Sequence, residues 1–157
     1  MKRNNYSLID EPKGDLYIDI INYAVNLCHE ALLVVRRTIP LADSGLKVLE
    51  KLEPYLIEKN LCSEWPGTRL LDDKAHVFRY TLNKECALII QKSSSRLYEW
   101  FQPNLPEDLC FLRTYKDPWL VSIAHEKDAY FSLSSEEKNM LIDTIPALSG
   151  FIKKDEF

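Results

Sequence analysis

Residues 109–133, LCFLRTYKDPWLVSIAHEKDAYFSL, change the hydrophobic pattern of the chain to a period of two, which predicts β-strands. We expect three short strands, at Leu109–Thr114, Trp119–His125 and Ala129–Leu133. The turns between them, Tyr115–Pro118 and Glu126–Asp128, are so short that consecutive strands must run antiparallel. This stretch therefore predicts a β-meander and a fold built on a sheet.

Helical patterns lie on both sides of this meander. After it, Ser134 and Glu137 match a capping box and predict a last helix, which is expected to break near Pro146. Before it, Asn83 is a helix cap, and a long apolar stripe extends from it to Trp100 and Phe101. The stripe predicts one helix that ends before the prolines at 103 and 106.

The first half of the chain shows two more helices and two strands. A helix is expected over residues 16–27, and a buried central strand within Glu30–Thr38. Apolar residues from Leu46 onward predict a second helix that ends near Asn60 and that Pro54 should kink or split. A loop over residues 63–71 then precedes a strand over residues 76–81, in which His76, Phe78 and Tyr80 share one face.

Together these segments predict the order α-β-α-β-α-β-β-β-α. We expect a single layered α+β domain over residues 15–152, with a mixed or antiparallel sheet of about five strands packed by helices. Residues 1–14 are expected to be a flexible lead-in and residues 153–157 a short charged tail.

Composition and charge exclude several classes of partner. The chain has 157 residues, 46% hydrophobic and 28% charged, with a formal net charge of −4 and charges of both signs interspersed. No basic stripe is available to neutralise phosphates, so neither nucleic acid nor an anionic membrane is an expected partner. We expect a monomer or a weak homodimer.

The cellular compartment is expected to be the cytoplasm. Met1–Asp10 lacks the apolar stretch of a signal peptide, and the longest apolar run, Ala31–Val35, is far shorter than a membrane span. The four cysteines are far apart in apolar segments, so we expect reduced core thiols and not disulfides or a zinc site. They are Cys28, Cys62, Cys86 and Cys110.

No metal or cofactor site is predicted. The three histidines, His29, His76 and His125, have no second ligand at the spacings that build such sites. With only four glycines, the chain also lacks phosphate-binding loops and dinucleotide motifs.

Acid–base chemistry has weak candidates. His125 with Glu126 or Asp128 is one, because imidazole exchanges protons near neutral pH. The acidic pairs Asp72–Asp73 and Glu107–Asp108 beside strand beginnings are others. Arginines at strand ends, such as Arg36, Arg37 and Arg113, must either reach solvent or find a carboxylate or an anionic ligand.

Six polar and aromatic residues are the candidates for a binding surface. They lie on predicted loops or strand ends, and residues of these types dominate interface hot spots and pocket linings. They are Trp65, Arg69, Arg79, Arg113, Trp119 and His125.

Two stretches also carry a resemblance. SEWPGT at residues 63–68, and PEDLCFLR at 106–113 with PWLVSIAHE at 118–126, resemble a group of small stand-alone bacterial proteins of unknown activity. The resemblance implies a bacterial, cytoplasmic, single-domain protein and transfers no catalytic residues.

Our leading hypothesis from the sequence is a non-enzymatic binding or regulatory protein that recognises a protein partner. An inhibitor or immunity protein that covers a basic toxin is one form of it, because complementary charge accelerates association. The alternative is a small hydrolase or transferase that uses His125 with a nearby carboxylate. Self-association through an exposed strand or the last helix is a third reading.

Overall fold

Most of the chain's strands join one antiparallel sheet. In the computed structural model, which describes residues 2–156, this sheet has eight strands in the order β10–β1–β9–β8–β7–β2–β6–β3. Its strands are β1 (Asn4–Leu8), β2 (Glu30–Arg36), β3 (Leu56–Cys62), β6 (Ala75–Thr81), β7 (Glu107–Arg113), β8 (Asp117–Ile123), β9 (Asp128–Leu133) and β10 (Ile152–Lys154). A separate small hairpin pairs β4 (Glu64–Trp65) with β5 (Thr68–Arg69).

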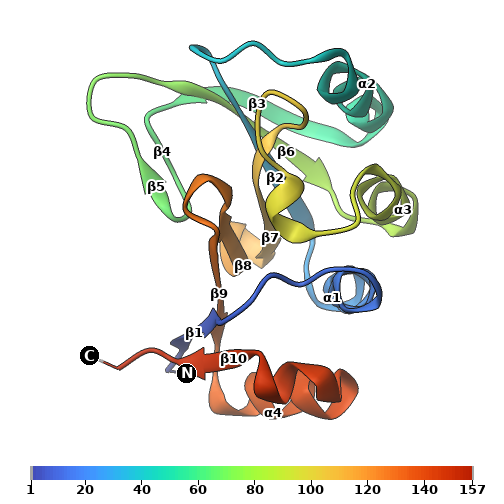
Figure 1. Cartoon of the computed structure of the whole chain (residues 1–157), viewed down its shortest axis with the longest axis vertical. Coiled ribbons are helices and arrows are strands. Elements are labelled where there is room, and N and C mark those ends of the chain that lie inside the picture. The colour runs from blue at the N-terminus through green and yellow to red at the C-terminus, as the bar shows by residue number, and fades with distance from the viewer. Residues whose placement is uncertain (1, 157) are drawn as a thin grey trace.

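The helices cover one face of the sheet, and the β4–β5 hairpin lies on the other (Figure 1). The helices are α1 (Asp15–Leu27), α2 (Asp43–Leu52), α3 (Lys84–Ser93) and α4 (Ser135–Thr144). Because a strand directs successive side chains to opposite faces, β2 contributes Ala31 and Leu33 to the helix side and Leu32 and Val34 to the other side. We call the side without helices the far face.

Apolar packing on the two faces is unequal. The helix side holds the large core, which includes fully buried Trp100, Trp119 and Phe111. A smaller cluster on the far face packs under the hairpin and consists of Leu32, Val34, Trp65, Ala75, Val77, Cys110, Leu112 and Val121. At the hairpin turn, Gly67 has φ +86°, and a Cβ there would lie 2.8 Å from Val121, so glycine permits this close approach.

The predicted sheet was wrong in size and the predicted element order was wrong. The structure is α+β with four helices, but the main sheet has eight strands, all antiparallel, and not about five. Two missing strands come from segments expected to be a flexible lead-in and a charged tail, because β1 lies in the first segment and β10 reaches into the second. Both strands are short, and they pair with each other across almost the whole length of the chain. The local hydrophobic pattern of either segment therefore does not reveal the strand with which it pairs.

The third missing strand, β3, replaces the second half of a predicted helix. Helix α2 ends at Leu52, and the segment around Pro54 is a single 3₁₀ turn before the chain extends into β3. Proline therefore ends the helix and does not kink it. Helix α3 is also shorter than predicted and ends at Ser93, whereas Trp100 is placed by a separate 3₁₀ turn.

Several local predictions are confirmed. Strands β7, β8 and β9 form the antiparallel meander. Ser134 and Glu137 form the capping box of α4, and the Asn83 side chain caps α3. All four cysteines are free, although Cys62 is only half-buried. None of the helices in the described part of the chain is long and apolar enough to cross a membrane.

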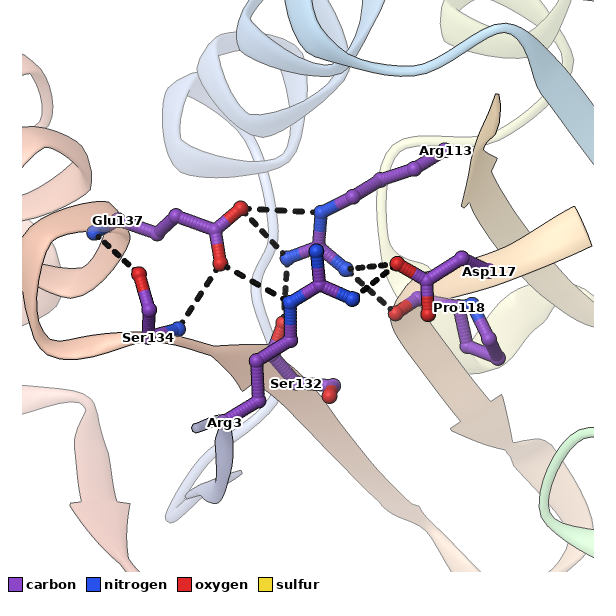
Figure 2. Close-up of polar contacts among 7 residues, drawn as sticks. All are labelled: Arg3, Arg113, Asp117, Pro118, Ser132, Ser134 and Glu137. Atoms are coloured by element: carbon purple, nitrogen blue, oxygen red, sulfur yellow. Dashed lines mark hydrogen bonds and ion pairs between the residues drawn. The ribbon is translucent and has the colours of Figure 1, made fainter. Parts of the chain in front are cut away.

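A network around Arg113 joins the meander to α4 and to the N-terminal segment (Figure 2). The guanidinium is buried and donates to Glu137 and to the carbonyl oxygens of Pro118 and Ser132. Arg3 bonds the same Glu137 and also Asp117. Burial alone would raise the pKa of Glu137, but the Ser134 N–H and the two arginines outweigh it, and the pKa is lowered. Arg113 is therefore a structural residue at the joint between β7, β8, β9 and α4.

Replacing Arg113 with alanine is expected to destabilise the fold. The change removes the Arg113 donor from one Glu137 oxygen and from two carbonyl groups, which should cost about 3 kcal/mol, the lower end for a broken buried pair. Urea denaturation measures this change. Arg37→Ala, which removes an exposed pair with Asp73, is the control and should have little effect. Equal midpoints for the two variants would contradict the structural role of Arg113.

Candidate functional site

A bulge at the start of β7 brings two neighbouring acids to one site. Between the pairs Val34–Glu107 and Leu32–Cys110, β2 advances by two residues and β7 by three, so β7 holds one extra residue. Asp108 sits in this bulge with φ 57°, in the left-handed region that aspartate tolerates better than most residues. In a regular strand the two carboxylates would point to opposite faces, and the bulge removes that restriction.

Asp108 is fully buried and fully hydrogen-bonded. One carboxylate oxygen accepts from the indole N–H of Trp65 at 3.0 Å, and the other accepts from the backbone N–H of Ala124 at 2.9 Å. These two bonds connect the β4–β5 hairpin and the β8–β9 turn to the start of β7. Asp108 is thus the residue that fastens the hairpin to the sheet.

Glu107 is also fully buried, and it pairs with an arginine. The Arg36 Nε donates to its carboxylate at 2.9 Å, and the backbone N–H of Gln102 lies at 3.4 Å. Burial raises the pKa of Glu107, and the charge of Asp108 adds to this shift, whereas Arg36 opposes it. The Arg36 guanidinium in turn lies 5.5 Å from the centre of the Trp65 ring.

His125 completes the cluster from the β8–β9 turn. It lies in a 3₁₀ turn at Ala124–Glu126, and its side chain is 38% exposed. One donor atom from each of Glu107, Asp108 and His125 lies within 4.8 Å of the others. The predicted partner Glu126 is 3.8 Å from the imidazole, but both side chains are exposed. The structure therefore joins His125 to the buried acidic pair.

These three residues have donor types that zinc and manganese accept. However, the carboxylate oxygens already accept hydrogen bonds, and the charge of Arg36 lies beside Glu107. A divalent cation would compete with the Arg36 and Trp65 N–H donors for these oxygens. The observed bonds favour a structural cluster with one accessible imidazole.

A groove on the far face shares one residue with the surroundings of this cluster, because Trp65, which bonds Asp108, is among its lining residues. The groove is a depression of about 240 Å³ that is also lined by Pro66 and by the almost wholly buried Leu32, Val77 and Leu112. Three charged residues, Glu64, Arg79 and Lys116, also line it. We call it the far-face groove.

The six residues predicted to form a binding surface do not lie together. Trp65 and Arg79 line the far-face groove, and Arg79 is held by ion pairs with Glu30 and Glu58. Arg69 is exposed on β5, and His125 lies in the β8–β9 turn. Arg113 is buried and bonded within the network around Glu137 that is described above. Trp119 is fully buried on the helix side and stacks on Tyr23.

One exposed residue beside the groove was not singled out from the sequence. Tyr115, next to Lys116 in the β7–β8 turn, is 97% exposed and has φ 60°. Lys116 has φ 59°. Such angles favour glycine or asparagine, so a bulky aromatic residue is strained there. The sequence offers no signal for this strain, because the backbone angles of the turn become known only from the structure.

Comparison with models of protein families, with curated proteins and with solved structures finds no match to this chain. The function must therefore be inferred from the geometry of the site.

Replacing Trp65 with phenylalanine tests the bond to Asp108. The variant leaves one oxygen of a buried carboxylate without its donor, which should cost about 1–3 kcal/mol beyond the lost ring volume. Trp119→Phe is the matched control, because the Trp119 indole N–H has no hydrogen-bond partner in the described structure. A double-mutant cycle of Trp65→Phe with Asp108→Ala by urea denaturation isolates the bond, and a coupling energy of zero would refute it.

Proposed function

We propose that this protein is a non-enzymatic binding protein that recognises a protein partner through the far-face groove and Tyr115. The observation that supports this most strongly is Tyr115, a nearly fully exposed aromatic side chain on a strained turn beside an open groove. Strain of this kind costs about 1–3 kcal/mol and is usually found at functional sites. Exposed aromatic residues are also the commonest hot spots of protein interfaces.

The size of the groove favours a partner's side chain over a cofactor. Small-molecule sites usually enclose about 300–1,000 Å³. The groove is smaller, at about 240 Å³, and open to solvent on the far face. Its apolar lining includes Leu32, Val77 and Leu112, which are almost wholly buried and expose little area. The groove therefore suits one small apolar side chain of a partner, next to which Tyr115 would pack.

The charges around the groove add specificity. Lys116 and Glu64 form no ion pairs within residues 2–156, so both remain available to a partner. Arg79 is already neutralised by two acids. In its narrower form the proposal is an inhibitor or immunity protein whose net charge of −4 attracts a basic toxin.

Tyr115→Asn is expected to stabilise the protein and to weaken partner binding. Asparagine relieves the strained angle, worth about 1 kcal/mol in thermal denaturation, so lost binding could not be attributed to unfolding. Affinity should fall about 30-fold, as for a hot spot of 2 kcal/mol.

The measurement is recovery of a stoichiometric complex from native extracts on size exclusion, followed by titration of the purified partner. Lys13→Glu, a change at an exposed lysine in the segment before α1, is the control and should bind like the wild type. Recovery of free monomer alone, or equal affinity of the Tyr115→Asn variant, would contradict the proposal.

A second candidate function, a small hydrolase, is favoured by one observation. The His125 imidazole is accessible and lies within 4.8 Å of two buried carboxylates. A carboxylate can orient an imidazole for general base catalysis, which typically contributes 10²–10⁴-fold. The fully buried acids themselves cannot contact a substrate, so His125 would be the catalytic residue.

His125→Ala separates the two functions. If the protein is a hydrolase, turnover of p-nitrophenyl acetate or p-nitrophenyl phosphate should fall about 100-fold in this variant, with an unchanged melting temperature. Wild-type turnover no faster than that of the variant would rule the hydrolase out and leave the binding proposal untouched.

A further inference from the structure

A second groove lies in the helical layer, between α2 and α3, and encloses about 400 Å³. Its apolar lining residues are Val48, Leu88, Ile89 and Leu105, of which Val48 and Leu105 are buried. Leu88 is 49% exposed, although it lies in the middle of α3. We call this the helix-side groove, and it shares no lining residue with the far-face groove.

Three lysines line the helix-side groove. Lys47 and Lys51 lie on α2 with a spacing of four residues, which places them one turn apart on the same side of the helix. Lys92 lies on the opposite wall, in the last turn of α3. Within residues 2–156 none of the three forms an ion pair.

No acid lines this groove. Asp43 and Glu50 on α2 and Glu85 on α3 belong to the same helices but are not among the lining residues. The whole chain carries a net charge of −4, so a groove whose charged lining residues are all lysines departs from the average surface. The local charge therefore attracts an anionic ligand, in contrast to the rest of the molecule.

We propose that the helix-side groove binds an acidic amphipathic helix of a partner protein. Such a helix would place an apolar stripe over Leu88, Ile89 and Leu105, a mode that grooves between helices commonly use. Carboxylates spaced four residues apart beside the stripe would face Lys47 and Lys51, because both helices share the same repeat. Lys92 would face an acid on the other side of the stripe.

An 18-residue alanine-based peptide with one leucine stripe flanked by glutamates is the probe. Its titration into the wild-type chain should shift the NMR methyl signals of Leu88, Ile89 and Leu105, and added salt should weaken binding. The matched peptide with lysines in place of glutamates should cause no such shifts. Equal binding of both peptides, or shifts confined to other methyl groups, would overturn the proposal.

The double variant Lys47→Glu, Lys51→Glu should weaken binding of the acidic peptide about tenfold or more, measured by fluorescence anisotropy. Lys153→Glu, Lys154→Glu changes the net charge equally at exposed positions on β10 and should bind like the wild type. Unchanged affinity of the first variant would overturn the proposal. Two other results would also overturn it. One is binding of dodecanoate, an anionic fatty acid, in preference to the peptide. The other is self-association of the chain that the double variant abolishes.

Discussion

The buried carboxylate of Asp108 determines how the far face is built. Its two oxygens hold Trp65 in the hairpin and the backbone of Ala124 in the β8–β9 turn, and a one-residue bulge in β7 places the group between them. Burying a charged group is costly unless each of its oxygens is bonded. The observed arrangement of the hairpin and the turn gives both Asp108 oxygens a hydrogen-bond donor. Because Trp65 lines the far-face groove, the shape of the groove depends on this arrangement.

The two faces of the sheet meet different demands. On the helix side, large apolar residues such as Trp119 and Phe111 supply the core. The far face has a small apolar cluster and a hairpin that covers only part of it, which leaves a groove beside Trp65. Most of the apolar core thus lies on the helix side, and the strained turn at Tyr115 adds cost without adding to that core.

The sequence predicted the elements that carry their own local signals. The meander follows from its period of two, and the capping box of α4 follows from Ser134 and Glu137. Strands β1 and β10 were not predicted, because each depends on a partner strand far away along the chain. Strand β3 was not predicted, because the helical spacing of apolar residues from Leu46 continues past Pro54 and indicated a longer helix.

The site was less predictable for a similar reason. Neighbouring acids were noted at Glu107 and Asp108, but regular strand geometry would separate them, and only the bulge brings both near His125. The aromatic and basic residues were judged by type, yet Trp119 lies in the core and Arg113 in an ion-pair network. Burial depends on which face of the finished sheet a residue occupies, and local sequence does not specify it.

The place of β1 has a consequence for how the molecule forms. This strand, close to the start of the sequence, lies between β9 and β10 and bonds to residues more than a hundred positions away. Contacts between such distant segments slow folding, because a long loop must close before they form. During synthesis β1 has no partner until β9 has been made, so the eight-stranded sheet cannot be completed before β9 and β10 have both left the ribosome.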